Sequence, residues 1–352
     1  DCRMDVLLER SGYGELLGHL ARRRTGQLEV EFADLRNTTL EKEGGRQRQR
    51  EREDAEYRGR VVDLEGGSEF AGLKMKRRFR ITNYAAGDTV RHHSRGRNEY
   101  CVSEALLQAD VVVNLPKPKT HRIAGYTAAL KNMIGINTRK EYLPHHRKGA
   151  KDRSGDEYLG SHRAWKWLNS TGNDIKNWAL RRRADALADA MNWACRLTGR
   201  KLDRLEEGRM KFGMWYGNDT IWRTILDVNR IVYYCDKEGR LCGERQRRVL
   251  HIGDMVVCGD QEGPMRPSYK KVGGVLFSDS PVEFDYCVAR LMGFDHRKIP
   301  TLLNALEGSG RTRKTDKIRL RSNCAEFDGE VDGIRRNFGF RPSSGWKGHI
   351  EL

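Results

Sequence analysis

The chain has 352 residues, of which 38% are hydrophobic and 33% charged, and its formal net charge is +17 with an isoelectric point near 9.6. This length suits one large α/β domain or two smaller ones, and no apolar run approaches the length needed to span a bilayer. The excess of positive charge favours anionic partners, which include nucleic acid, phosphorylated metabolites, acidic glycans and an anionic membrane surface.

The first third of the chain mixes helical and strand patterns with one charged run. Residues 4–24 are expected to be helical with a break near Gly12 and Gly14. Residues 40–58 are nearly all charged or polar, which predicts an exposed, weakly ordered loop or a solvated helix. A basic RNA-binding arm is the alternative, but the acids interleaved in this run disfavour it. Strands are predicted at 28–35, 59–65 and 78–84.

The rest of the chain alternates strands with helices. Ser103 is expected to cap a short helix, and the β-branched run 111–116 is typical of an interior strand buried on both faces of a mainly parallel sheet. Residues 137–175 form a polar stretch that is too long for a plain connector. Further helices are expected at 125–135, 177–198, 218–234 and 282–292, and further strands at 249–258 and 272–277.

This order of elements predicts the fold class. Strands that alternate with helices are typical of an α/β protein, here with a mainly parallel or mixed sheet covered by helices on both faces. We expect residues 1–310 to form a single domain with an inserted polar loop and helical region at about 137–217. A basic, irregular tail is expected at 311–352.

The eight cysteines are scattered, and no pair has the Cys-x-x-Cys spacing of an iron–sulfur or zinc-ribbon site. A chain of this length does not need disulfides to fold, so reduced thiols and a cytoplasmic location are expected. The sequence begins at Asp1 and shows no signal peptide. We therefore expect a processed or internal start, from which a leader or a first strand is missing.

Three segments carry a resemblance to a known family. Residues 109–135 read ADVVVNLPKPKTHRIAGYTAALKNMIG, with Asn-x-Pro-Lys-x-Lys-Thr-His at 114–121 and Thr-x-x-x-Lys-Asn at 127–132. Later stretches contain Glu262-Gly263-Pro264 and, in SDSPVEFDYCVARLMGF, a Pro-Val-x-x-Asp pattern. In this order, over roughly residues 60–305, they resemble the bacterial and archaeal family known as domain of unknown function 362. The cysteine motifs of its ferredoxin-like members are absent, so the resemblance implies no iron–sulfur cluster.

The segment after the 111–116 strand is a candidate anion site. In open α/β sheets ligands bind beyond the carboxyl ends of the strands, where this segment begins. Lys117, Lys119 and His121 alternate along an extended stretch and would project to one side, which suits a phosphate or a carboxylate. The alternative is a solvated basic loop.

Lys131 and Asn132 lie within an apolar helical pattern. A lysine there either extends to the helix edge or pairs with a ligand or an acid. If Lys131 is partly buried, its pKa falls, and it becomes a candidate base or nucleophile.

The long polar stretch offers a candidate metal site. The ligands would be His121, His145 or His146, with a carboxylate from Asp156 or Glu157, a set that suits zinc, iron or manganese. No helical metal-binding spacing is present, and a hydrogen-bonded histidine cluster is the favoured alternative. A metal is therefore left open.

The favoured function is an enzyme that acts on an anionic small molecule or glycan precursor, phosphorylated or carboxylated, with Lys131 and His121 as the catalytic pair. A non-catalytic binder of RNA or another polyanion is the alternative, and a scaffold or cofactor-handling protein is a third class. The reaction and the oligomeric state stay open. The expected substrate-binding residues are Asn114, Lys117, Lys119, Asn132, Arg147, Glu262 and Asp285.

Overall fold

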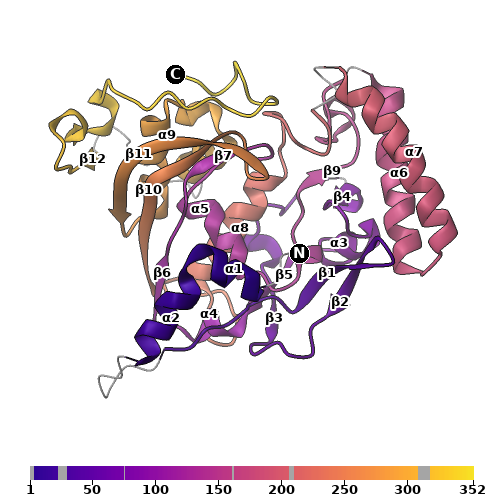
Figure 1. Ribbon diagram of the computed structural model, residues 1–352, viewed down its shortest axis with the longest axis horizontal. Coiled ribbons are helices and arrows are strands. Elements are labelled where there is room, and N and C mark those ends of the chain that lie inside the picture. The colour runs from indigo at the N-terminus through magenta and orange to yellow at the C-terminus, as the bar shows by residue number, and fades with distance from the viewer. Residues whose placement is uncertain (1–3, 23–29, 75, 161, 206–209, 308–317) are drawn as a thin grey trace.

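The computed structural model describes residues 4–22, 30–74, 76–160, 162–205, 210–307 and 318–352. Its largest sheet is built on a long antiparallel ribbon of β10 (Arg248–Glu262) and β11 (Arg266–Ser278). The other edge of β10 pairs in parallel with two short strands, β6 (Val111–Asn114) and β7 (Lys119–His121). β8 (Gly125–Thr127) continues from β7 in antiparallel pairing. The sheet is therefore mixed, and helices pack around it (Figure 1), which confirms the α/β class.

Four helices and the sheet share the main hydrophobic core. They are α5 (Ala129–Asn132), α8 (Ile221–Tyr234), α9 (Pro281–Met292) and α10 (Pro300–Glu307). One side of α8 contributes Ile225 to this core, and another side places Val228 in a second core beneath β3 (Gly59–Asp63) and β5 (Glu99–Ser103). Because α8 borders both cores, it joins the two halves of the molecule.

The other regular elements lie around these cores. In the order of the chain they are α1 (Met4–Ser11), α2 (Tyr13–Arg22), β1 (Thr38–Glu43), β2 (Arg46–Glu51), β4 (Phe79–Arg80), α3 (Ala86–His92), α4 (Glu104–Gln108), β9 (His146–Arg147), α6 (Arg163–Arg181), α7 (Asp185–Asp203), β12 (Arg319–Leu320) and β13 (Gly329–Glu330). The strands pair as β1–β2, β3–β5, β4–β9 and β12–β13, each in a two-stranded antiparallel sheet. No described helix is long and apolar enough to cross a bilayer.

Elements with strong local signals lie where the sequence predicts them. α9 begins after Ser280, whose side chain accepts a hydrogen bond from Glu283 N, and it ends at Gly293, where φ is +87°. α4 begins after Ser103, which accepts from Ala105 N. The break between α1 and α2 falls at Gly12, with φ +77°. These predictions are confirmed because capping and turn chemistry depend on a few adjacent residues.

The prediction that 111–116 forms an interior strand is wrong. Within the described residues β6 pairs with β10 on one side and with no strand on the other, so it is an edge strand. The side chains of Val111 and Val113 are about half exposed, at 55% and 52%. Branched apolar residues favour extended backbone, but they do not determine how many neighbours the strand acquires.

Other predicted elements differ in kind or in length. The run 40–58 contains no buried side chain, as expected, but residues 40–51 are ordered in the β1–β2 hairpin and only 52–58 form a loop. The predicted 177–198 helix is two helices, α6 and α7, separated at 182–184. The predicted 125–135 helix begins as β8 and contains only one turn of α5 before a 3₁₀ segment. Residues 30–35 form no strand, residues 28–29 lie outside the described ranges, and only 79–80 of 78–84 are in β4.

The last described segment, 318–352, packs against the core although it has little regular structure. Trp346 and Ile350 are buried there, and Trp346 Nε1 donates to Arg122 O at 2.7 Å. Arg341 pairs with Asp260 of β10. These contacts hold the turn between β7 and β8 against the end of the chain.

Candidate functional site

His121 is held by the tight turn that joins β7 to β8. Its Nδ1 accepts hydrogen bonds from the backbone N–H groups of Ile123 (3.1 Å) and Ala124 (3.3 Å). The proton of the neutral ring therefore lies on Nε2, which makes that atom a donor. Burial lowers the pKa of His121 well below its usual value, and Lys131 and His145 lower it further.

Lys131 is positioned by α5. The short helix is oriented by Asp285 of α9, whose carboxylate accepts from Ala129 N (2.6 Å) and Leu130 N (3.3 Å). Burial lowers the pKa of Lys131 to about 8, and the positive charge of Lys119 lowers it further. The Lys131 side chain is half-buried, and its ammonium is repelled by a second ammonium.

His145 faces the same place from the polar stretch before β9. Its Nδ1 donates to Leu143 O at 2.8 Å, so Nε2 carries a lone pair. Burial lowers the pKa of His145 to about 4, and the charges of Lys131 and Lys140 lower it further.

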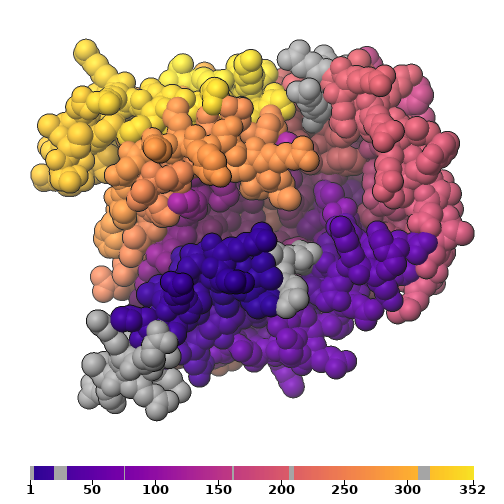
Figure 2. All heavy atoms as spheres, in the orientation of Figure 1, coloured from indigo at the N-terminus to yellow at the C-terminus, as the bar shows by residue number. Residues whose placement is uncertain are grey.

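Lys119, His121, Lys131 and His145 together form what we call the cationic cluster. The other three members all lower the pKa of His121, and Lys131 also lowers that of His145. Lys119 Nζ donates to Lys117 O at 3.0 Å, and burial lowers the pKa of Lys119. Within the described ranges no carboxylate forms an ion pair with Lys119 or Lys131. In the view shared by Figures 1 and 2 the surface is hollowed between α1 and the β10–β11 ribbon, in the region where β7 and α5 lie.

Lys117 does not join this cluster through its ammonium. Its Nζ binds Asp254 Oδ2 at 2.6 Å, and both side chains are about half exposed. The bond to Lys117 lowers the pKa of Asp254. The expected group of Lys117, Lys119 and His121 is therefore divided, with Lys117 on the surface and the other two in the cluster.

A buried amide network fixes the residue next to Lys131. Asn132 Nδ2 donates to Asn114 Oδ1 at 2.6 Å, and Asn114 Nδ2 donates to His251 Nδ1 at 3.0 Å. His251 Nε2 lies 2.8 Å from the Tyr233 hydroxyl. Sequence reasoning missed His251 and Tyr233, although a histidine in the apolar run VLHIG was a usable signal. The network holds Asn132 beside Lys131 at the surface.

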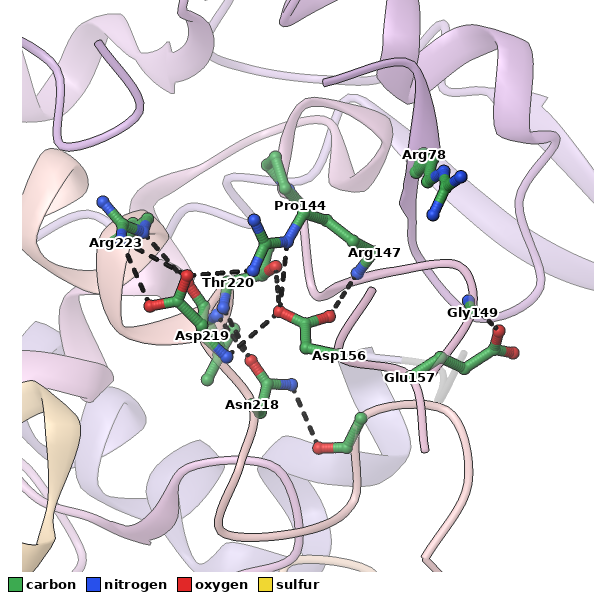
Figure 3. Close-up of polar contacts among 12 residues, drawn as sticks. Arg78, Pro144, Arg147, Gly149, Asp156, Glu157, Asn218, Asp219, Thr220 and Arg223 are labelled. Atoms are coloured by element: carbon green, nitrogen blue, oxygen red, sulfur yellow. Dashed lines mark hydrogen bonds and ion pairs between the residues drawn. The ribbon is translucent and has the colours of Figure 1, made fainter. Parts of the chain in front are cut away.

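Asp156 and Arg147 belong to a different network, at the start of α8 (Figure 3). The Asp156 carboxylate accepts from the backbone N–H groups of Arg147 and Asp219 and from the Thr220 hydroxyl. The Arg147 guanidinium binds Asp219 at 2.9 Å. The oxygens of Asp156 are therefore occupied in orienting backbone, and Arg147 binds a carboxylate of the chain itself.

The expected metal ligands do not assemble. Glu157 accepts from Gly149 N at 3.0 Å, and burial raises its pKa to about 7. His146 Nε2 lies 4.0 Å from Glu157 Oε1, and burial lowers the pKa of His146 to about 3. Across the described residues no three His, Cys, Asp or Glu side chains form a group that could hold a metal ion. His121 and His145 thus belong to the cationic cluster, apart from the two carboxylates.

Glu262 and Asp285 also have roles within the fold. Glu262 binds Arg122 at 2.8 Å and accepts from Ser344 N, so it ties the β7–β8 turn to the end of the chain. Asp285 accepts from the first backbone N–H group of α5 and so caps that helix, and burial raises the pKa of Asp285 to about 8. A cavity of about 1020 Å³ between β11 and the β12 region contains none of the predicted site residues.

The fold and this site define a basic α/β protein with a partly buried cluster of lysines and histidines at one end of a mixed sheet. Residues 66–290 match the sequence model of the family described as domain of unknown function (DUF362), so the chain belongs to this family. No curated protein and no solved structure matches the chain.

Proposed function

We propose that the protein is an enzyme that binds an anionic small molecule, phosphorylated or carboxylated, at the cationic cluster and moves a proton there. The observation that carries the proposal is the uncompensated charge of Lys119 and Lys131. Both side chains are half-buried, and neither ammonium pairs with a carboxylate of the described residues. Withdrawing such charges from water is costly, so a chain that retains two of them within electrostatic reach of each other is suited to an anion that is not part of the fold. A phosphate or a carboxylate supplies that charge.

The donors in the cluster suit an oxyanion. Lys119 and Lys131 each contribute an ammonium, and His121 contributes Nε2–H, so three donors from β7 and α5 are available to the same ligand. Charge-assisted hydrogen bonds of this kind are short, and they are strong where water is excluded. Asn132, fixed by Asn114, adds a polar amide at the rim.

Proton transfer is the chemical step that these groups support. A lysine with a pKa of about 8 is close to the midpoint of its titration near neutral pH, which suits a general acid or base. His145 presents an unprotonated Nε2, and His121 presents a protonated one. We assign Lys131 and His121 as the catalytic groups and His145 as a proton acceptor that faces them.

The state of the cysteines supports a reducing compartment. The seven cysteines in the described ranges are all free thiols, four of them buried. We propose a cytoplasmic location on this basis, because structural disulfides persist in oxidising compartments and are rare in the cytosol.

The proposal predicts a specific pH dependence, which sulfate tests because it does not titrate in this range. Lys131 must be protonated to bind the anion, and its pKa in the free protein is about 8. The dissociation constant, measured by isothermal titration calorimetry, should be nearly constant from about pH 6.5 to 7.5 and rise about tenfold per unit above pH 8. An affinity that does not change between pH 7 and 9.5 would rule out Lys131 as the binding cation.

A further inference from the structure

The helical hairpin of α6 and α7 carries an exposed apolar surface. Four of the seven tryptophans of the chain, Trp165, Trp167, Trp178 and Trp193, are exposed there, and Trp193 retains 66% of its accessible surface. Tryptophan is the largest amphipathic side chain and is seldom left in water without a partner. Figures 1 and 2 place both helices at the edge of the molecule, on the side away from the β10–β11 ribbon.

The spacing of the exposed residues places them away from the contact between the two helices. The helices meet through Asn169, whose Nδ2 donates to Cys195 O and Thr198 Oγ1, and through Gly172, which packs against Cys195. The exposed apolar residues recur at helical spacing on the sides that point away from this seam. We call this surface the outer face, and it consists of Leu168, Ile175, Trp178, Leu187 and Leu197. Trp193 does not belong to it, because Trp193 lines a cavity beside the β1–β2 hairpin.

The charges of the hairpin are separated. All four of its carboxylates form ion pairs. Asp185 and Asp189 bind arginines of the β1–β2 hairpin. Asp174 binds Arg80 and Lys148, and Asp203 binds Lys211. By contrast, several cations of the hairpin form no ion pair with any residue that the structure describes. Two of them, Lys176 and Arg196, line the cavity beside the β1–β2 hairpin. Four others lie at the two ends of the α6–α7 hairpin, Arg182 and Arg183 in the connection and Arg200 and Lys201 in the last turn of α7.

We propose that the outer face docks on the surface of an anionic lipid bilayer. Apolar side chains between two groups of cations are the arrangement of helices that lie in a membrane interface, where the apolar residues enter the boundary of the acyl chains and the cations meet the headgroups. Trp178 and Trp165 lie under Arg182 and Lys201, respectively, so each end pairs an interfacial aromatic ring with a cation. The helices have 19 residues each, so the face is roughly 28 Å long.

Charge and side-chain type favour lipid over the other occupants. A second copy of this chain in a two-fold contact would bring the same unpaired cations against one another. Single-stranded nucleic acid requires aromatic rings interleaved with cations along a track of phosphates, whereas four of the five residues of the outer face are aliphatic. An anionic bilayer accommodates both the aliphatic centre and the cations at the ends.

Vesicle flotation of the full chain tests the proposal. The protein should float with phosphatidylcholine vesicles that contain phosphatidylglycerol and should stay in solution with phosphatidylcholine alone. A Trp178→Ser, Leu197→Ser variant, called the tryptophan variant, should lose about tenfold or more of its binding, because both side chains are exposed on the outer face and inserted. An Arg200→Gln, Lys201→Gln variant should also bind more weakly. A Met265→Ser, Tyr269→Ser variant removes two still more exposed large side chains from the β10–β11 ribbon and should bind like the wild type.

The contrary outcomes are distinct. Absence of flotation by the wild type, or unchanged flotation of the tryptophan variant, overturns the proposal. If the tryptophan variant instead loses binding to a single-stranded RNA oligonucleotide, while the wild type ignores vesicles, the face is a nucleic-acid surface. If it converts a dimer to a monomer in sedimentation velocity, and vesicles are again ignored, the face is a contact between copies. Circular dichroism of each variant confirms that the loss is not one of folding.

Discussion

A Lys131→Met variant should bind sulfate about a hundredfold more weakly than the wild type. Its free energy of unfolding should be higher, so the variant should be the more stable protein. Methionine keeps the apolar stem of the side chain and removes a charge-assisted hydrogen bond to the anion, which is worth about 2 to 3 kcal/mol. The gain in stability follows from the lowered pKa of Lys131, about 8. At pH 7 the ammonium is charged in both states, but burial and Lys119 penalise it in the folded state alone, by about 2 kcal/mol.

The size of this stability effect depends on pH. The penalty on charged Lys131 is fully present below pH 8 and fades as the pH rises toward the ordinary value of a lysine, so the two proteins should converge in stability in that direction. Calorimetric titration with sulfate and urea unfolding at pH 7 measure the two effects.

Lys117→Met is the matched control. Lys117 lies two residues from Lys119 but forms an exposed ion pair with Asp254, so its loss should change sulfate binding by less than about threefold and stability by less than about 0.5 kcal/mol. A Lys131→Met protein that binds sulfate normally but unfolds more easily would show that Lys131 is a structural residue.

An Arg247→Met variant should lose about 4 kcal/mol of stability, the largest effect that we expect from one substitution outside the site. The Arg247 side chain is buried, and burial lowers its pKa, yet its guanidinium has several hydrogen-bond partners. They are the backbone carbonyls of Leu107, Ala109, Ile231, Val232 and Cys235. These carbonyls lie at the ends of α4 and α8, where a helix offers few donors. Ile231 O also accepts from Cys235 N, so the other four depend most on Arg247.

Methionine at position 247 would fill much of the space and leave these buried carbonyls without donors, at about 1 to 3 kcal/mol for each one that water cannot reach. Urea unfolding measures the loss. Arg245→Met is the control, because Arg245 is exposed and only stacks over Tyr233, so its loss should cost about 0.5 kcal/mol or less. A loss below about 1 kcal/mol for Arg247→Met would mean that the helix ends are satisfied in another way.

The parts of the fold that sequence predicts are those with local causes. Ser280, Pro281 and Gly293 define α9 through adjacent residues alone. The β1–β2 hairpin could not be predicted because its partners are remote. Arg46 pairs with Asp189, which lies 143 residues later in the chain, and a charged run offers no apolar alternation that would indicate a strand.

The candidate site divides in the same way. Lys119, His121 and Lys131 could be found because they are close in sequence and lie on β7 and α5. The roles of the carboxylates could not be predicted, because a sequence does not show which acidic side chains accept hydrogen bonds from backbone N–H groups. Asp156 and Asp285 are both consumed in that way, at the starts of α8 and α5. Likewise nothing in the basic run around Arg247 distinguishes the one buried arginine from its exposed neighbours.

The central claim is that Lys119, Lys131 and His121 surround the position of an anion. A crystal of the protein soaked with tungstate tests it directly, since tungsten gives a strong anomalous signal. We expect an anomalous peak with its oxygens about 3 Å from Lys119 Nζ, Lys131 Nζ and His121 Nε2. Tungstate bound only elsewhere, or a carboxylate of the chain found against Lys131 Nζ, would contradict the account.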